Sequence, residues 1–168
     1  SDYNYKFYKQ LLESKGLKED KNFCNYKKIA AIWPYKLQKL THLWRTDVLL
    51  TEKCTLNCTF CNMYMPHYDK QKHRDFEEIK LDIDIYFKRV DYVSVFHLIG
   101  GEPLLYPYAA QVIDYVSNNY REKIGYFFLT TNGTITPKDT VLNSIKNNNL
   151  VIHISYYTDH INYGRKFN

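Results

Sequence analysis

Residues 75–103 read DFEEIKLDIDIYFKRVDYVSVFHLIGGEP and place a helix signal, a strand signal and a turn in direct succession. Apolar side chains recur at every third or fourth position of the first half, which predicts an amphipathic helix over 75–90. Asp75 and Glu78 resemble a capping box at its start. Residues 92–99 are rich in valine, phenylalanine and isoleucine, and therefore predict a buried strand.

The same alternation of strand and helix continues on both sides of this stretch. Pro107 and the Thr136-Pro137 pair mark the starts of two more helices, with Thr136 as an N-cap and Pro137 in the first helical position. Short apolar runs predict three further strands, over 48–50, 124–130 and 150–155. Alternating strands and helices favour a parallel sheet, so we expect an α/β fold with about four parallel strands.

Composition indicates one globular domain. Of the 168 residues, 45% are hydrophobic and 17% aromatic, which suffices for a sizeable core. The longest apolar runs are far shorter than the roughly 20 residues needed to span a bilayer, so we do not expect a membrane protein. Lys and Arg outnumber Asp and Glu by 23 to 18, but the basic residues are scattered among acids, and nucleic acid is not an expected partner.

Two regions differ in pattern along the chain. Residues 1–46 are basic and aromatic with apolar side chains at helical spacing, and we expect an N-terminal helical extension there. The core domain is expected over 47–168. The first residues lack the apolar stretch of a secretory signal, and clustered thiols without such a signal are typical of a reducing compartment. A cytoplasmic location follows as an expectation.

The polar motifs of the chain come at the ends of the expected strands. Reactive groups in parallel α/β sheets collect at the carboxyl ends of the strands, so we expect one site at that edge. Its four parts are the cysteines after the first strand, GGEP (100–103) after the second, TNG (131–133) after the third and Ser155 at the end of the fourth.

Three of the four cysteines, Cys54, Cys58 and Cys61, fall within the segment CTLNCTFC. Soft sulfur ligands select zinc, copper(I) or an iron–sulfur cluster. A structural zinc site almost always has four protein ligands, and Cys24 or His67 could supply the fourth. Three thiolates on a four-iron cluster would instead leave one iron open to a small molecule. The residues by themselves leave both kinds of site open.

The spacing Cys-x-x-x-Cys-x-x-Cys, with an aromatic residue before the last cysteine, closely resembles the signature of the radical S-adenosylmethionine (radical SAM) superfamily. The GGEP and TNG motifs resemble the superfamily in order and spacing. The run MYMPHY (63–68) also resembles an uncharacterised group of this superfamily, in which the cysteine loop continues into a Met-Pro-aromatic segment.

The resemblance implies that the three loop cysteines ligate a 4Fe-4S cluster. It further implies a set of residues around S-adenosyl-L-methionine, namely Phe60, Gly100, Gly101, Glu102, Pro103, Thr131, Asn132 and Ser155. In that set the glycines would let the backbone approach the methionine part of the cofactor, and Glu102 would accept its amino group. Phe60 would shield the cluster or stack near the adenine.

By the same resemblance, the reduced cluster passes one electron to bound S-adenosylmethionine, which yields methionine and a 5'-deoxyadenosyl radical that removes hydrogen from a substrate carbon. The implied partners are an electron donor such as a flavodoxin or ferredoxin and a small or carbohydrate-like substrate. The superfamily core has six strand–helix units, whereas this chain ends just beyond an expected fourth strand. We therefore expect a partial barrel, either from a longer enzyme or from a short form that a partner completes.

The sequence is compatible with three functions. The first is a radical SAM enzyme, and the second is an activase for a glycyl-radical enzyme. The third is a non-catalytic module that holds zinc or an electron-transfer cluster through the loop cysteines and Cys24, so loss of metal in Cys24→Ser would indicate it. His97, inside an expected strand, is either a proton-handling group of the reaction chamber or a buried core histidine.

Overall fold

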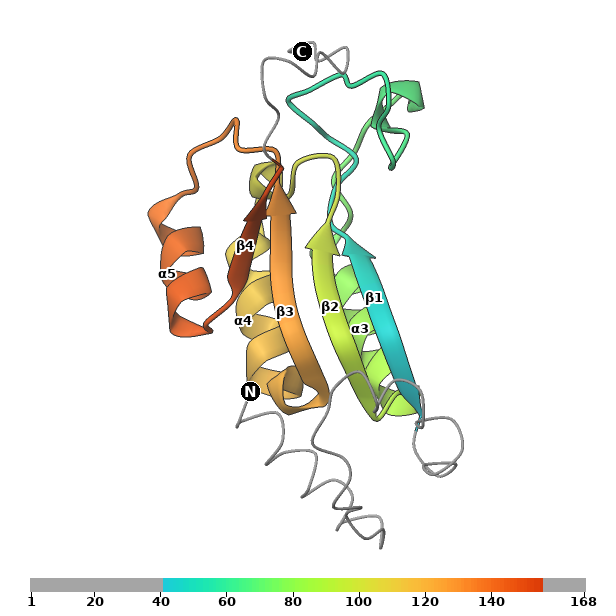
Figure 1. Ribbon diagram of the computed structural model, residues 1–168, viewed down its shortest axis with the longest axis vertical. Coiled ribbons are helices and arrows are strands. Elements are labelled where there is room, and N and C mark those ends of the chain that lie inside the picture. Colours follow the sequence, from blue (N-terminus) through green and yellow to red (C-terminus); the bar gives the residue numbers. More distant parts are fainter. Residues whose placement is uncertain (1–40, 156–168) are drawn as a thin grey trace, which may run out of the picture.

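A computed structural model describes residues 41–155 of the chain (Figure 1). Four parallel strands form one sheet in sequence order, β1 (His42–Leu49), β2 (Tyr92–Ile99), β3 (Ile124–Thr131) and β4 (Val151–Ile154). The helices between them are α3 (Phe76–Arg89), α4 (Ala109–Tyr120) and α5 (Asp139–Asn147). Single turns of 3-10 helix, η1 (Met65–His67), η2 (Pro103–Leu105) and η3 (Arg121–Lys123), lie in the connections. The expected α/β fold with four parallel strands is confirmed.

The helix α3 follows directly from its sequence. Asp75 is the N-cap, and its side chain accepts hydrogen bonds from the backbone N–H groups of Glu77 and Glu78. The two glutamates of the first turn also interact favourably with the positive end of the helix dipole. Ile79 and Phe87 lie on the buried side of the helix. The apolar spacing and the polar cap thus specify the same element.

The hydrophobic core lies between the sheet and the helices. Figure 1 shows α3 and α4 behind the sheet, and α4 packs against both α3 and α5. The fully buried side chains at the centre come from the helix-facing positions of β2 and β3 and from α3 and α4, and include Phe96, Leu98, Leu129, Ile79, Val112 and Ile113. No helix within residues 41–155 is long and apolar enough to cross a lipid bilayer.

The first strand begins earlier than expected. Leucines at helical spacing predicted helix up to residue 46, but β1 pairs in parallel with β2 from His42 onward. The expectation of helix over 42–46 is therefore wrong, because backbone pairing with β2 determines the conformation there. β1 is the outermost strand of the sheet, and residues 43–45 are all exposed. Its sequence therefore lacks the alternation of polar and apolar residues that is typical of a strand. The rest of the expected helical extension, residues 1–40, lies outside the described residues.

Two helix starts also differ from the prediction. The helix α4 begins at Ala109 rather than at Pro107. The helix α5 begins at Asp139 with Lys138 as its N-cap, so Thr136 does not cap it. The carbonyl of Lys138 accepts the first helical hydrogen bonds, and the burial of Val141 fixes where the helix packs. Packing of the apolar face thus determines this start more strongly than the local capping signal does.

Candidate functional site

The loop that follows β2 lies against the segment that leads into the cysteine loop. The Gly101 N–H donates to the Thr51 carbonyl, and the Glu102 N–H donates to the Lys53 carbonyl, both at 2.8 Å. A Cβ on Gly100 would lie 2.5 Å from the Thr51 oxygen. A Cβ on Gly101 would lie 2.4 Å from the Lys53 oxygen. Glycine is therefore required here for backbone contact between two loops, and approach of the same glycines to a cofactor stays a prediction.

The Glu102 side chain is fully buried and connects this loop to the end of β3. Its Oε1 accepts from the Leu104 N–H at 3.0 Å and from the Thr131 hydroxyl at 2.9 Å. Its Oε2 accepts from the Asn132 N–H at 2.7 Å. Three donors compensate for the burial of the carboxylate. Because a carboxylate oxygen can accept two hydrogen bonds, Oε2 keeps one acceptor position, and the expected bond to the amino group of the cofactor stays a prediction.

The Asn132 side chain forms a ring of hydrogen bonds with two threonines. Its Nδ2 donates to the Thr55 hydroxyl at 3.0 Å, and the Thr134 hydroxyl donates to its Oδ1 at 2.7 Å. The Thr55 and Thr134 hydroxyls contact each other and complete the ring. Nδ2 also lies 3.6 Å from the Cys54 Sγ as a donor. We call Thr55, Asn132 and Thr134 the Asn132 ring; it joins the cysteine loop to the loop after β3.

The end of β4 reaches the same edge of the sheet. The Ser155 N–H donates to the Thr131 carbonyl at 2.9 Å, so Ser155 lies directly beside the end of β3. The Thr131 hydroxyl accepts from the Gly133 N–H at 3.1 Å while it donates to Glu102. All four loops that the sequence analysis singled out therefore follow strands at one edge, as Figure 1 shows. Contact of the Ser155 side chain with a cofactor stays a prediction.

The thiols of Cys54, Cys58 and Cys61 are half-buried and lie outside disulfides. Burial is the main reason that the pKa of Cys54 is raised, although the Leu56 N–H donates to its sulfur at 3.4 Å. Within residues 41–155, no three Cys, His, Asp or Glu side chains are gathered closely enough to hold a metal ion as they stand. The chemistry of the donor set nevertheless fits an iron–sulfur cluster, because three soft thiols share one short segment. Cys24 lies outside the described residues.

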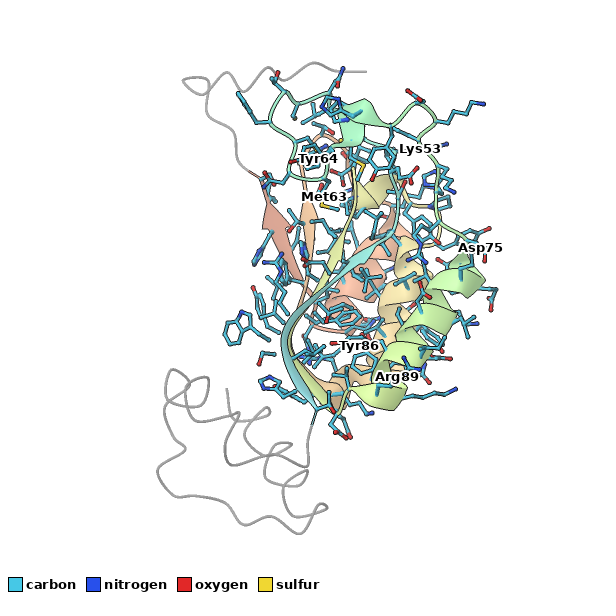
Figure 2. All side chains as sticks on the ribbon, turned by 90° about the vertical axis from the view of Figure 1, so that its right-hand side faces the viewer. Lys53, Met63, Tyr64, Asp75, Tyr86 and Arg89 are labelled. Carbon is cyan, nitrogen blue, oxygen red and sulfur yellow. The ribbon has the colours of Figure 1, made fainter. Side chains whose placement is uncertain are left out.

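The cysteine loop exposes aromatic side chains. Phe60 is 77% exposed and Tyr64 is 68% exposed. In contrast, Met65 is only 1% exposed, and its carbonyl accepts from the Gln71 side chain at 2.8 Å, so the Met-Pro-aromatic segment is anchored. Figure 2 shows Met63 and Tyr64 at the same end of the molecule as Lys53, which leads into the loop. Phe60 is accessible to a ligand, and its contact with one stays a prediction.

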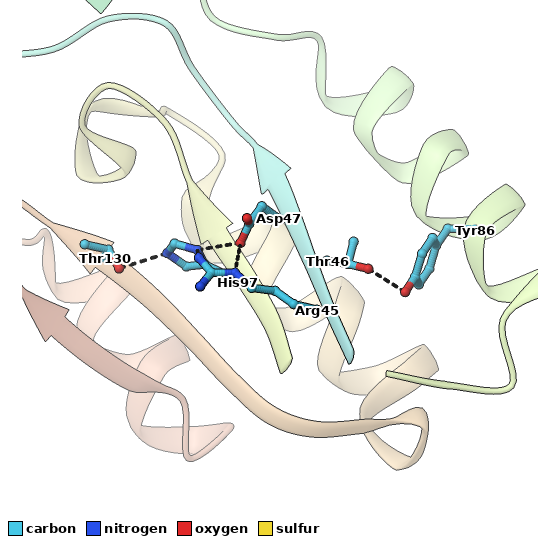
Figure 3. Close-up of polar contacts among 6 residues, drawn as sticks. All are labelled: Arg45, Thr46, Asp47, Tyr86, His97 and Thr130. Carbon is cyan, nitrogen blue, oxygen red and sulfur yellow. Dashed lines mark hydrogen bonds and ion pairs between the residues drawn. The ribbon is translucent and has the colours of Figure 1, made fainter. Parts of the chain in front are cut away.

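His97 belongs to a polar network on the sheet face opposite α3 and α4 (Figure 3). Its Nε2 lies 2.8 Å from the Thr130 hydroxyl, and its Nδ1 lies 2.8 Å from Asp47 and 3.0 Å from Arg45. The ring also stacks on Phe128. Burial lowers the pKa of His97, although Asp47 opposes the shift. The side chain is 3% exposed and both ring nitrogens have protein partners, so His97 is a buried histidine with satisfied hydrogen bonds. It lies on the sheet face away from the helix-packed core, and a proton-handling role stays a prediction.

Comparison with known families identifies the chain. A sequence model described as the radical SAM superfamily matches residues 48–166. The chain belongs to the radical SAM superfamily. The matched range starts within β1 and includes the cysteine loop, GGEP and TNG, so the resemblance carried by those motifs is confirmed. A comparison with curated proteins found no match.

Two solved structures of radical SAM proteins with bound ligands match part of this chain. One, described as native anSMEcpe with bound AdoMet and Cp18Cys peptide, shares 22% identity with a TM-score of 0.54, over 75% of this chain and 35% of its own. Another, Streptococcus suis SuiB bound to precursor peptide SuiA, shares 19% identity with a TM-score of 0.48, over 80% of this chain and 31% of its own. The first likeness shows the fold. This radical SAM chain spans about a third of the length of these structures.

Sequence reasoning missed residues that assemble the site. Thr51 and Thr134 lie outside the recognised motifs, and Thr55 occupies a spacer position of the cysteine motif. Each of the three nevertheless forms a hydrogen bond that links two of the loops or holds Asn132. The position of Thr134 directly after TNG is the only sequence signal that could have indicated its role. The contacts of Thr51 and Thr55 join segments distant in sequence and required the structure.

Proposed function

We propose that this radical SAM chain binds a 4Fe-4S cluster through Cys54, Cys58 and Cys61, binds S-adenosylmethionine beside it, and cleaves that cofactor reductively for hydrogen abstraction from a substrate. The observation that carries the proposal is the junction of three loops at the carboxyl edge of the sheet. Glu102 joins the loops after β2 and β3, and the Asn132 ring joins the latter to the cysteine loop. A cofactor bound at this edge would contact all three loops together.

The cysteine loop supplies the ligands for the cluster. Its three thiols leave one iron of a four-iron cluster without a protein ligand, and S-adenosylmethionine would bind there. Two N–H donors, from the Leu56 backbone and the Asn132 amide, already point to the Cys54 sulfur. Hydrogen bonds of this kind stabilise negative charge on ligating sulfur atoms. When bound, the cluster and S-adenosylmethionine would supply a 5'-deoxyadenosyl radical and methionine after transfer of one electron.

The loops after β2 and β3 would orient S-adenosylmethionine. The second acceptor position of the Glu102 Oε2 is suited to a charged amino group, because charge-assisted hydrogen bonds are strong and directional. The three donors to Glu102 keep its carboxylate in one position before the cofactor arrives. The exposed ring of Phe60, one residue before Cys61, would cover the bound cofactor by stacking.

Anaerobic reconstitution of the full chain tests the proposal. Iron, sulfide and zinc are measured per chain, and the loaded protein is then treated with dithionite and S-adenosylmethionine. We expect about four iron and four sulfide ions in the wild-type chain, and we expect 5'-deoxyadenosine and methionine as products. Cys58→Ala should lose most of the iron, whereas Cys24→Ser should load as the wild type does. Chromatography of the products separates cofactor cleavage from simple cluster binding.

The outcome also separates the alternatives. A chain that binds zinc, and loses it in Cys24→Ser, would contradict the enzyme and indicate the non-catalytic module. A loaded chain that forms no 5'-deoxyadenosine under reducing conditions would equally refute reductive cleavage. The substrate remains expected to be small or carbohydrate-like, and the electron donor a flavodoxin or ferredoxin. A glycyl-radical enzyme as the partner would require a radical on a second protein, which EPR of the mixture detects.

A further inference from the structure

The orientation of the Asn132 amide is determined by its neighbours. The Thr134 backbone N–H lies 3.0 Å from the Asn132 Oδ1, and a backbone N–H can only donate. The accepting atom must therefore be the oxygen of the amide, and the nitrogen must face the cysteine loop. Exchange of the two amide atoms would place two donors against each other, so the hydrogen-bond network determines the orientation.

The two threonines of the Asn132 ring then determine which group donates in each hydrogen bond of the ring. The Thr134 hydroxyl donates to Oδ1 at 2.7 Å, so it can only accept from the Thr55 hydroxyl. The Thr55 oxygen in turn accepts one N–H of Nδ2 at 3.0 Å. An amide nitrogen has two hydrogens, and the second is left for the Cys54 sulfur at 3.6 Å. Every polar atom of the side chain thus has a partner, and one of them is a cysteine.

The backbone of Asn132 is also held in place, by a hydrogen bond to Glu102. Its N–H donates to the buried Glu102 carboxylate at 2.7 Å, a charge-assisted bond. The residue is therefore held by Glu102 through its backbone and by Thr55 and Thr134 through its side chain. A donor fixed by this many bonds costs little reorganisation when the charge on its acceptor changes.

We propose that Asn132 is a positioning residue for Cys54, whose amide N–H donates to the sulfur and thereby favours the reduced state of a cluster ligated by that sulfur. The proposal rests on the proposed function, since it requires a cluster on Cys54. The physical reason is that reduction adds negative charge to the cluster and its thiolates, and a hydrogen bond to sulfur stabilises that charge. Under this proposal, the side-chain amide of Asn132 acts on the cluster through the Cys54 sulfur.

An EPR-monitored redox titration of the reconstituted full chain tests the inference. Asn132→Ala and Asn132→Asp both remove the N–H donor, and the second keeps the shape of the side chain. We expect at least a threefold fall in the equilibrium constant for reduction in each, which is about 28 mV for a one-electron couple at 59 mV per tenfold change. The matched control is Asn118→Ala, the same change at an exposed asparagine of α4 outside the loops of the site, with no expected shift.

The outcomes distinguish a failure of this inference from a failure of the proposed function. A wild-type chain that takes up no cluster would overturn the proposed function and this inference together. Variants that load fully and titrate at the wild-type potential would overturn the inference alone. Thermal unfolding of the metal-free variants shows whether they fold. A folded Asn132→Ala chain that takes up less than half of the wild-type iron, while Asn118→Ala loads fully, would support the positioning of Cys54.

Discussion

Glu102→Gln tests the junction between the loops after β2 and β3 without any cofactor. The substitution keeps the size of the side chain but replaces one carboxylate oxygen with an NH₂ group. If that group takes the place of Oε2, it faces the Asn132 N–H, and two donors oppose each other. If it takes the place of Oε1, it faces the Leu104 N–H instead. In either orientation one backbone N–H at this fully buried position loses its acceptor.

The expected cost follows from the bond that is lost. A hydrogen bond to a charged group contributes about 1.5–3 kcal/mol, and a buried donor without a partner costs a similar amount. We expect the free energy of unfolding of Glu102→Gln to be about 2 kcal/mol below that of the wild type. For a chain of this size, such a change lowers Tm by about 4–8 °C. The cost arises before any cofactor binds, because all three partners of the carboxylate belong to the protein.

Urea unfolding of the metal-free full chain, followed by circular dichroism under reducing conditions, measures this difference. Glu122→Gln is the matched control, because the same chemical change is made at an exposed glutamate. We expect its free energy of unfolding to stay within about 0.5 kcal/mol of the wild type. A Glu102→Gln chain as stable as this control would refute the claim that the buried carboxylate connects the two loops.

Three further predictions concern other parts of the site and the sheet. Gly101→Ala should lower the free energy of unfolding by about 1–3 kcal/mol, because the new Cβ overlaps the Lys53 carbonyl; an unchanged urea midpoint would contradict this close approach. Burial lowers the pKa of His97, so the unfolded chain takes up more protons below about pH 6.5 and stability should fall as the pH falls from 7 to 5. His97→Gln should show a shallower fall in Tm over that range, and an identical slope would argue against titration of His97. Phe60→Ala should leave Tm unchanged, since the ring is exposed, but should weaken binding of S-adenosylmethionine to the loaded chain; equal affinity in a calorimetric titration would exclude the stacking role.

Local sequence signals predicted much of the fold. The helix α3 carries its own cap and its own apolar spacing, so both its existence and its bounds could be inferred. The strands β2 and β3 are buried runs of apolar residues next to polar turns and were also recognisable. The order of strands and motifs then placed the cysteines, GGEP and TNG at one edge of the sheet. Each of these inferences used only neighbouring residues and the chirality of parallel connections.

The remaining features depend on contacts between distant residues. Cys54 and Asn132 are 78 residues apart in sequence, and no local pattern indicates their hydrogen bond. The need for glycine at position 101 arises from the Lys53 carbonyl, which lies in another loop. The start of β1 was misjudged for the same reason, because pairing with β2 rather than local spacing determines it. Tertiary contacts of this kind determine how the site is assembled, and local sequence patterns do not indicate them.

EPR of the reduced, reconstituted chain with and without S-adenosylmethionine tests the central claim most directly. The claim is that three thiols hold a 4Fe-4S cluster with one iron open to the cofactor. We predict a signal of a reduced 4Fe-4S cluster whose shape changes when S-adenosylmethionine is added, and no such signal from Cys58→Ala. A cluster signal that is identical with and without S-adenosylmethionine, or a chain that takes up zinc in place of iron, would contradict it.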